Sequence, residues 1–582
     1  MFLYHAYPVL CRLGEIMLKL EAKKYIKNPI LLISSVFIFI WMILYLFLDN
    51  EIKISYRPEL ILVNVIKALP IMFFIFILIS YEMFYQSKKH KLDEVVYTIR
   101  NGKIKEIAGI FFILIAMDGI LSFLSFFACY NYYQEKNIIN NAYMTYTVRV
   151  IIIYVFLPLV LSMFLGMLAA QFKNRITGIS VALILYFLFD STFVSFLMAL
   201  FISNIDLSNI CLLFAVIYRS PEMIADRNYF VTAENVHIYR IIFWIVVCIA
   251  LIVMKNTKNV FKILTSLLIV VLAFNVAMIP SGASYQFFQM SNCDAWVHDQ
   301  IYYEEYFTKY ESKNKEILKQ VKNYKDDFTA DSYEMNLDIS NQINAKVLVK
   351  PSVKNKEKYD FTLYHGYKVK KVSDEEGNEL EYKRVGDFIE IYNNNKNIEE
   401  IQFEYSGHCG FFYATSQAVN LPGGFAYYPI PGWHTVYSGE EDEFKNNLLK
   451  NKAKFLVNVH SMKFELYSNL AEEETSDDVV RFKGRANTFL LIGNPYLNKK
   501  NIEGVDVIYS EMESEQNPEK QKEDYQTLLD SLKKHKIVDK KMNIFLYQTG
   551  GSEYSSMGDG YLYGNLLSIP DYLEELQGGK NE

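Results

Sequence analysis

The chain has 582 residues, which is too long for one ordinary domain. Its formal net charge of −6 provides no basic excess, so we expect no nucleic acid among its partners. Long apolar runs fill residues 1–280 and are absent from residues 281–582, which excludes a uniformly soluble protein.

Seven apolar runs in the first half are long enough to cross a bilayer core of about 30 Å as helices. They occupy about 30–48, 60–84, 107–130, 148–171, 177–202, 237–254 and 260–280. The sequence therefore predicts a polytopic α-helical membrane domain of about seven spans over residues 1–280.

Lys and Arg are unevenly divided between the connections on the two sides of these spans. With the N-terminus inside, the inner loops and span ends hold sixteen Lys and Arg residues and the outer ones hold seven. Cytoplasmic loops carry such an excess, so we expect a cytoplasmic N-terminus. An odd number of spans then places residues 281–582 outside the cell. The charged N-terminus and the full-length first run predict no cleavable signal peptide.

A few residues interrupt the apolar runs. Lys67, Asp118 and Asp190 lie inside or at the ends of spans, where an ionised group is costly and favours contacts within the helix bundle. For Lys67 we prefer snorkelling to the outer interface. The segment Ile210–Tyr218 is too short to span, and we expect a re-entrant or interfacial piece.

Two elements are expected on the cytoplasmic face. Glu15–Asn28 alternates apolar and basic residues at helical spacing, as an amphipathic helix on the inner surface would. Ser80–Lys105 contains Glu82, a basic turn and an acidic-apolar stretch. A solvated loop that only orients the protein would explain the second element equally simply.

The order of these elements resembles the membrane subunit of ABC-2 type ABC transporters. In that family an interfacial helix precedes the first span, and a glutamate at the end of span two leads into a short coupling helix that docks on the ATPase. The resemblance covers residues 1–280, and it places Ile210–Tyr218 where the family has re-entrant helices. The coupling residues that it implies are Glu82, Leu92, Asp93, Glu94 and Val95.

The resemblance also implies partners. A second copy, or a similar permease, would complete the transport path, and a separate subunit would supply the ATPase. No phosphate-binding GxxxxGK[ST] loop occurs in the sequence, which agrees with ATP hydrolysis on another chain, and no cofactor is expected. The family usually has six core spans, so the run at 260–280 departs from it, and we interpret that run as a stalk.

The second half has the pattern of a mainly-β domain. After a stalk or linker over 281–330, apolar and polar residues alternate with period two, for example in Tyr333–Ile339 and Phe388–Tyr392. A β-sandwich-like domain is therefore expected over 331–500. An amphipathic helix at 524–536 and a strand at 543–547 indicate a small α/β portion over 501–582.

Several stretches of this half resemble the N-terminal β-domain of M1 aminopeptidases. They are YEMNLDISNQ from Tyr333, GNELEYKRVGDFIEIY from Gly377, IQFEYSG from Ile401, YYPIPGWHTVY from Tyr427 and VRFKGRANTFLLIGNPY from Val480. The likeness lies in strand order and spacing, and residues 501–582 resemble the start of the family's catalytic domain.

The zinc chemistry of that family is missing. Its peptidases hold zinc with two His at i and i+4 and a Glu, and no HExxH motif occurs here. The family's GxMEN strand would fall near Gly560–Asn565, where Met and Glu are absent, and Glu582 lies about where the zinc helix would begin. We expect no enzyme activity: the domain is either a catalytically inactive binding module or the front half of an enzyme completed elsewhere.

Other site candidates in this half are weak. His408 and Cys409 are adjacent and His434 follows a loop later, so a metal site is conceivable, but exposed turn residues are the preferred interpretation and no metal is predicted. A disulfide between Cys293 and Cys409 requires an extracellular domain and is the less favoured outcome.

The leading hypothesis is a permease subunit of an ABC transporter in the cell membrane of a bacterium, with an extracytoplasmic peptide- or substrate-binding domain. The alternatives are a membrane-anchored M1-like peptidase or half-peptidase, and a peptide receptor or immunity protein at the outer surface.

Overall fold

The computed structural model describes most of the chain outside its loops. The described residues are 19–47, 58–89, 102–135, 141–200, 210–218, 225–226, 230–231, 233, 235–257, 259–279, 302–303, 321, 324, 327–340, 342–393, 398–409, 412–415, 418–438, 443–460, 464–476, 478–510, 518–536, 542–546, 555–566 and 568–578. The chain forms two compact units. The helical unit comprises Met1–Glu222 and Ala233–Ile279, and the β unit comprises Met223–Thr232 and Pro280–Glu582.

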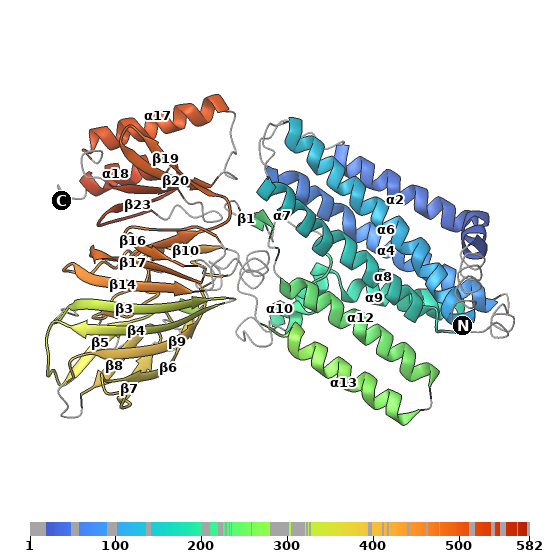
Figure 1. Ribbon diagram of the computed structural model, residues 1–582, viewed down its shortest axis with the longest axis horizontal. Helices are drawn as coiled ribbons and strands as arrows, with labels where there is room; N and C mark the ends of the chain where they lie inside the picture. The colour runs from blue at the N-terminus through green and yellow to red at the C-terminus, as the bar shows by residue number, and fades with distance from the viewer. Residues whose placement is uncertain are drawn as a thin grey trace, which may run out of the picture. The chain divides into compact units, whose positions relative to one another are not determined.

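Long apolar helices build the helical unit (Figure 1). After a helical segment at 19–27, they are α2 (Pro29–Phe47), α4 (Pro58–Lys89), α6 (Gly102–Glu135), α7 (Asn141–Ile151), the π-helix η1 (Ile152–Phe156), α8 (Leu157–Ala169), α9 (Arg175–Leu188), α10 (Ser191–Leu200), α12 (Asn235–Asn256) and α13 (Val260–Ala277). Among the described residues, six helices are long and apolar enough to cross a membrane, with α7, η1 and α8 forming one of them.

The expected span at 177–202, the fifth in chain order, is not one continuous helix. The helix α9 ends at Leu188 and α10 begins at Ser191, so the chain breaks at Phe189 and Asp190. The Asp190 carboxylate accepts a hydrogen bond from the Thr192 amide at 2.9 Å, as a residue that starts a helix does. The apolar pattern does not reveal this break, because apolar residues continue on both sides of it.

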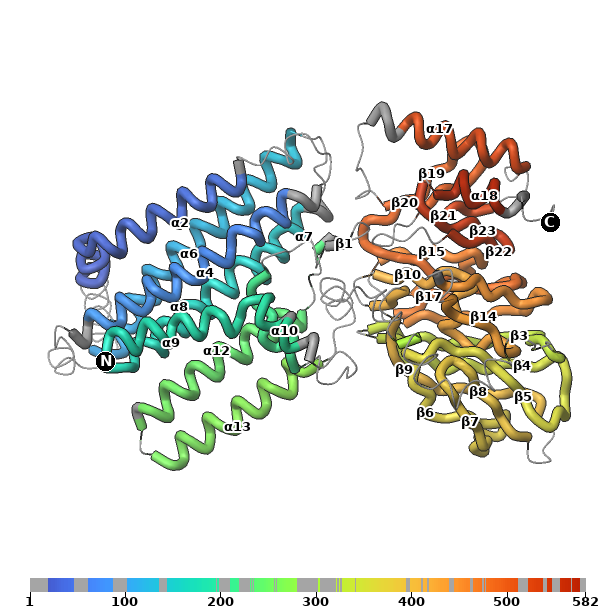
Figure 2. Tube along the Cα trace, turned by 180° about the vertical axis from the view of Figure 1, so that it is seen from behind, coloured from blue at the N-terminus to red at the C-terminus, as the bar shows by residue number. Residues whose placement is uncertain are grey.

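The helices α4 and α8 form the centre of the helical unit. Their spanning stretches are each 72% buried, against 6% for α13, which lies at the edge of the unit beside α12 in both views (Figure 1, Figure 2). The Ser80 hydroxyl donates to the Met163 carbonyl at 2.7 Å. A Cβ atom at Gly166 would lie 2.5 Å from the Ile77 carbonyl oxygen, so glycine permits this close approach of the two helices.

The main layer of the β unit is a seven-stranded sheet with the order β16-β17-β14-β3-β4-β9-β6. Its strands are β3 (Ala330–Ile339), β4 (Ile343–Pro351), β6 (Tyr367–Ser373), β9 (Ile401–Gly407), β14 (Ala453–His460), β16 (Ala471–Thr475) and β17 (Val479–Ala486). Side chains alternate between buried and exposed along β3, β4 and β14, which confirms the period-two pattern of the sequence. The strands β14 and β3 pair in parallel, whereas the other neighbours are antiparallel.

Smaller sheets cover the buried face of this layer. One has the order β11-β5-β8-β7 and another the order β10-β18-β15, and β12 pairs with β13. These strands are β5 (Lys358–Thr362), β7 (Tyr382–Val385), β8 (Phe388–Tyr392), β10 (Val419–Leu421), β11 (Ile430–Pro431), β12 (Tyr437–Ser438), β13 (Glu443–Phe444), β15 (Leu466–Ser468) and β18 (Leu491–Gly493). The shared core is rich in aromatic residues, including Tyr333, Tyr405 and Tyr428.

A five-stranded sheet, β19-β20-β21-β23-β22, forms the α/β portion. Its elements are β19 (Leu497–Ile502), β20 (Val505–Ser510), α17 (Pro518–Lys534), β21 (Asn543–Leu546), β22 (Ser556–Gly558), β23 (Tyr561–Gly564) and α18 (Ser568–Gly578). Both helices pack on this sheet through a core that includes Leu532, Ile544 and Leu573 (Figure 1). The sheet starts at Leu497, a few residues before the expected boundary at 501. A separate hairpin pairs β1 (Ala225–Asp226) with β2 (Phe230–Val231).

Candidate functional site

One end of α4 is fastened to the start of α9, at the side of the helical unit that we expect to face the cytoplasm. The Arg175 guanidinium lies 3.4 Å from the Glu82 carboxylate, which also accepts a hydrogen bond from Gln86. The Tyr81 hydroxyl donates to the Arg175 carbonyl at 3.3 Å. Gly178 makes room for the Tyr81 ring, because a Cβ there would lie 2.6 Å from it. We call Tyr81, Glu82, Arg175 and Gly178 the α4–α9 clamp.

Among the predicted coupling residues, Glu82 belongs to this clamp. The other four, Leu92, Asp93, Glu94 and Val95, fall in the connection between α4 and α6 and lie outside the described residues. Their role stays a prediction. The helix α4 itself continues to Lys89, beyond the expected end of its span at residue 84.

Two ion pairs, one in the helical segment 19–27 and one at the start of α6, form a charge network that the sequence analysis missed. Glu21 is buried and pairs with Lys24 at 2.5 Å, and Lys103 pairs with the buried Glu106 at 2.9 Å. Burial raises the pKa of Glu21, whereas Lys24 lowers it and Glu106 raises it, so the two pairs act on one another. The i, i+3 spacing of opposite charges in each helix was the signal available in the sequence.

Tyr25 connects the same segment to α2 and α6 through its hydroxyl. Its hydroxyl contacts the Ser35 hydroxyl of α2 and donates to the Met117 sulfur of α6 at 3.3 Å. The amphipathic helix expected in this region therefore packs against α2 and α6 along its buried side.

The segment 210–218, which we expected to be re-entrant or interfacial, closes the break between α9 and α10. The chain leaves the break at Asp190 and returns to it at Ile217, where the Ser191 amide donates to the Ile217 carbonyl at 2.9 Å and the Ile217 amide donates to the Phe189 carbonyl at 3.1 Å. Asp190 is 1% exposed and Ile217 is fully buried. The protein thus buries the non-helical backbone at this break, as such backbone would require at membrane depth.

Four buried side chains with polar groups lie together here, and one of them, Tyr218, belongs to segment 210–218 itself. The Tyr154 hydroxyl, on the π-helix η1, lies 3.3 Å from Nε2 of His237, and the Tyr154 and Tyr218 rings meet edge to face at 5.7 Å. The charge of buried Arg240 acts on both Tyr218 and His237. We call Tyr154, Tyr218, His237 and Arg240 the α12 polar cluster. A π-helix within a span often marks a functional position.

Asp118 lies in the middle of α6 and is fully buried. Its Oδ1 accepts a hydrogen bond from Ser122 at 3.3 Å, and among the described residues its Oδ2 has no hydrogen-bond partner. The expectation that Asp118 and Asp190 lie inside the bundle is confirmed. Lys67 is half-buried.

The weak metal candidates of the β unit do not converge. The His434 ring lies 2.8 Å from the Pro431 carbonyl, and the Cys409 sulfur accepts a hydrogen bond from the Phe412 amide at 3.3 Å. Within the described ranges, no group of three His, Cys, Asp or Glu side chains could hold a metal ion. Cys293 lies outside them, so its disulfide with Cys409, the less favoured outcome, is not tested.

We expected the GxMEN position near Gly560–Asn565, and the strand found there is β23. Its four residues are buried, and the Tyr563 hydroxyl donates to the Asn420 side chain at 3.0 Å. This strand packs inside the β unit and carries no carboxylate.

No protein-family model matches this chain, and no curated protein matches it in sequence. Solved structures do match it. Native leukotriene A4 hydrolase from Saccharomyces cerevisiae is 12% identical with a TM-score of 0.26, and the match covers 41% of each chain. An M1 zinc metallopeptidase from Deinococcus radiodurans is 10% identical with a TM-score of 0.27, and the match covers 43% of this chain and 63% of that one.

This chain therefore spans less than two thirds of either protein's length. TM-scores this low carry no argument about activity, and the matches do not bear on the helical unit's resemblance to ABC-2 permeases. Over about 41% of its length, the chain has structural neighbours among M1 zinc metallopeptidases and leukotriene A4 hydrolases.

Proposed function

We propose that the chain is the permease subunit of an ABC-2 type transporter that is energised by a separate ATPase. The observation that carries this proposal is the broken span α9–α10 with its re-entrant segment at 210–218. Continuous helices are sufficient for a protein that is only anchored in the membrane. A helix broken at membrane depth and buried by its own re-entrant segment is instead a feature of proteins that move a solute.

The α12 polar cluster supports the same proposal. Buried ionisable groups in membrane helices are costly, and they commonly border substrate or ion pathways. Here Arg240 and His237 come from α12, Tyr154 from a π-helix, and Tyr218 from the re-entrant segment. Three separate elements thus place polar groups at one point inside the bundle.

The α4–α9 clamp and the charge network of segment 19–27 suit coupling to an ATPase. Force applied to the connection after α4 would reach α9, and through it the break at Asp190, by way of the Glu82–Arg175 pair. The chain carries no phosphate-binding loop of its own. In this proposal, two permease copies or a pair of similar permeases form the transport path.

The β unit serves in this proposal as an extracytoplasmic substrate-binding domain without peptidase activity. Its exposed sheet face is available for a ligand, and its sequence lacks the HExxH motif that zinc peptidases of the M1 type require.

The test is co-expression with the ABC-type ATPase encoded beside this gene. We expect the two proteins to purify together in detergent, and we expect the chain to increase the rate of ATP hydrolysis. A chromosome region with no such ATPase, or an ATPase that neither binds nor responds to the chain, would overturn the proposal.

A further inference from the structure

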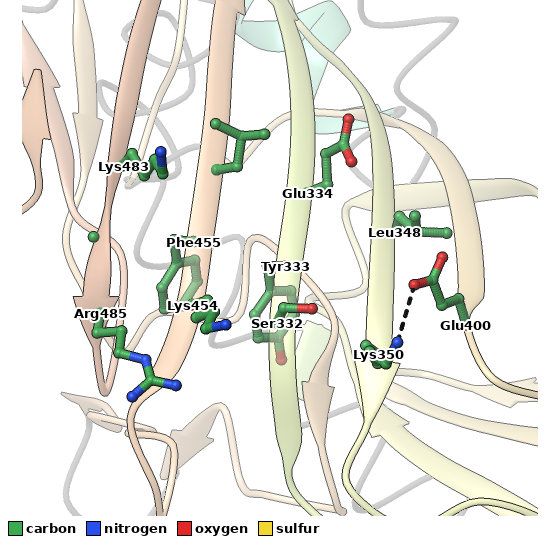
Figure 3. Close-up of a pocket in the computed structure, with 12 residues that line it drawn as sticks. Ser332, Tyr333, Glu334, Leu348, Lys350, Glu400, Lys454, Phe455, Lys483 and Arg485 are labelled. Atoms are coloured by element: carbon green, nitrogen blue, oxygen red, sulfur yellow. Dashed lines mark ion pairs between the residues drawn. The ribbon is translucent and has the colours of Figure 1, made fainter. Parts of the chain in front are cut away.

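The exposed face of the seven-stranded sheet contains a hollow of about 490 Å³. Its lining includes Lys454 and Leu456 of β14, Lys483 and Arg485 of β17, Glu334 of β3 and Leu348 of β4. Figure 3 labels five of these side chains, all except Leu456, on neighbouring strands, with Arg485 and Lys454 side by side. We call this site the basic hollow.

We expect the arrangement of charges in the basic hollow to lower the stability of the sheet. Lys454 and Arg485 lie directly opposite each other in the pairing of β14 and β17. Like charges in directly opposed positions destabilise a sheet. Among the described residues, neither side chain has an ion-pair or hydrogen-bond partner, whereas Lys483 pairs with Glu473 at 3.0 Å and Lys350 with Glu400 at 3.6 Å. Two adjacent cations without a counter-charge are suited to an anionic ligand.

The next row of side chains across the same face of the sheet is apolar and acidic instead of basic. Leu456 pairs with Glu334 across β14 and β3, and Leu348 pairs with Glu334 across β3 and β4. Two apolar side chains therefore flank one exposed carboxylate, which also has no ion-pair partner among the described residues. From strand spacing and rise, the Cα atoms of Lys454 and Glu334 lie about 8 Å apart.

These features select one class of ligand. A polyanion such as a phospholipid surface would be repelled by Glu334, whose charge no cation among the described residues neutralises. A short peptide with free ends carries one anionic and one cationic group, and two or three extended residues separate its ends by roughly 7–10 Å. An apolar side chain near the cationic end would lie on Leu348 or on Leu456, which flank Glu334 on the two neighbouring strands.

We propose that the basic hollow binds a short peptide, whose terminal carboxylate contacts Lys454 and Arg485 and whose terminal ammonium contacts Glu334. This inference deepens the substrate-binding role proposed above for the β unit, and its biological purpose rests on that role. Peptide binding is measured without an ATPase, so failure of this inference and failure of the transporter proposal give different results.

The experiment titrates the full chain in lipid nanodiscs with the tripeptide Ala-Leu-Ala, its C-terminal amide and its N-acetyl form. We expect amidation and acetylation each to weaken binding by roughly tenfold or more, because each removes a charge-assisted contact. Lys454→Gln with Arg485→Gln should weaken binding of the free peptide and abolish the effect of amidation. Glu334→Gln should abolish the effect of acetylation instead.

Lys346→Gln is the matched control, because Lys346 lies on the same face in β4 but outside the basic hollow and pairs with Glu404 at 3.9 Å. It should bind all three peptides as the unmodified chain does. The proposal is overturned if no tripeptide binds at millimolar concentration, or if the variants weaken the three peptides equally. It is also overturned if peptide binding is absent and the Lys454→Gln, Arg485→Gln variant abolishes binding to phosphatidylglycerol vesicles instead.

Discussion

The Glu82–Arg175 ion pair is important for the two helices that it joins rather than for the stability that it contributes. The Arg175 side chain is 48% exposed, and ion pairs at such sites contribute about 0–1 kcal/mol to stability. The pair nevertheless joins the end of α4 to the start of the broken span. Its removal should therefore affect coupling more than folding.

We predict that Arg175→Glu lowers ATPase stimulation by at least about fivefold, the lower range of typical coupling energies. The thermal midpoint should change little, and the charge swap Glu82→Arg with Arg175→Glu should restore much of the stimulation. The measurement is ATP hydrolysis by the purified complex. Full stimulation by the single variant would show that the clamp does not transmit the signal.

Arg384, in contrast, is a residue that we expect to contribute to the stability of the β unit. It donates to the carbonyls of Gly386 at 2.9 Å and of Leu363 and Tyr364 at 3.0 Å each, and also to that of Tyr367 at 2.5 Å. Burial lowers the pKa of this guanidinium and nearby Asp387 raises it. Four backbone carbonyls thus accept hydrogen bonds from one side chain.

We predict that Arg384→Met lowers the free energy of unfolding of the β unit by about 3 kcal/mol or more, because several buried carbonyls lose their donor. Arg481→Met is the control: its Nε donates to the Asn458 side chain at 2.9 Å on an exposed sheet face, and its loss should cost about 1 kcal/mol or less. Urea unfolding of the purified chain measures both. Equal losses would contradict the role assigned to Arg384.

At the scale of elements, the connection between α4 and α6 is the predicted docking segment for the ATPase. Its acidic-apolar stretch Leu92–Val96 suits a short amphipathic helix that lies in a groove of a partner. The alternative, a loop that only orients the protein, makes a different prediction for charge reversal.

We predict that Asp93→Lys with Glu94→Lys abolishes co-purification of the ATPase while membrane insertion stays intact. Added Lys would reinforce the inside-positive bias, so a purely orienting loop should tolerate the change. The readout is ATPase recovered with the tagged chain. If the double variant binds and stimulates its ATPase like the unmodified chain, the coupling-helix assignment is wrong.

Element type was predictable where periodicity is strong. The strands β3 and β8 and most of α17 lie where alternation or helical spacing placed them. The break at Asp190 was not predictable, because hydropathy averages over the interruption and the backbone bonds to Ile217 come from a segment 27 residues later. The α12 polar cluster was missed for a similar reason, since Tyr154 and His237 are 83 residues apart and become neighbours only through helix packing.

At the scale of the whole molecule, the orientation in the membrane stays a prediction. Within the part of the chain that the structure describes, six helices meet the length and hydropathy of a span, and the 14-residue α9 is shorter. If α9 and α10 together count as one crossing, the total is odd and the β unit lies outside the cell.

We predict that protease added to intact cells removes a tag placed after Glu582 and leaves an N-terminal tag untouched. The inside-positive distribution of Lys and Arg is the physical reason. Immunoblots for the two tags, with lysed cells as the control for protease access, provide the measurement. The reverse pattern would refute the topology.

We also predict that the purified chain has no zinc-dependent aminopeptidase activity. It lacks the His pair that would ligate zinc and the adjacent Glu that would activate water. Metal analysis and aminoacyl substrate cleavage with and without chelator test this. Stoichiometric zinc together with chelator-sensitive cleavage would favour the peptidase alternative.

The parallel pairing of β14 with β3 has a consequence for synthesis of the protein. The strand β3 ends at Ile339 and β14 begins at Ala453, so about 110 residues are translated between them. At 5–20 residues per second this takes roughly 6–23 s. During that interval one edge of β3 has no partner strand, and an open edge can pair with another chain. Slowed translation of this stretch should therefore lower the yield of folded protein more than the same delay after His460.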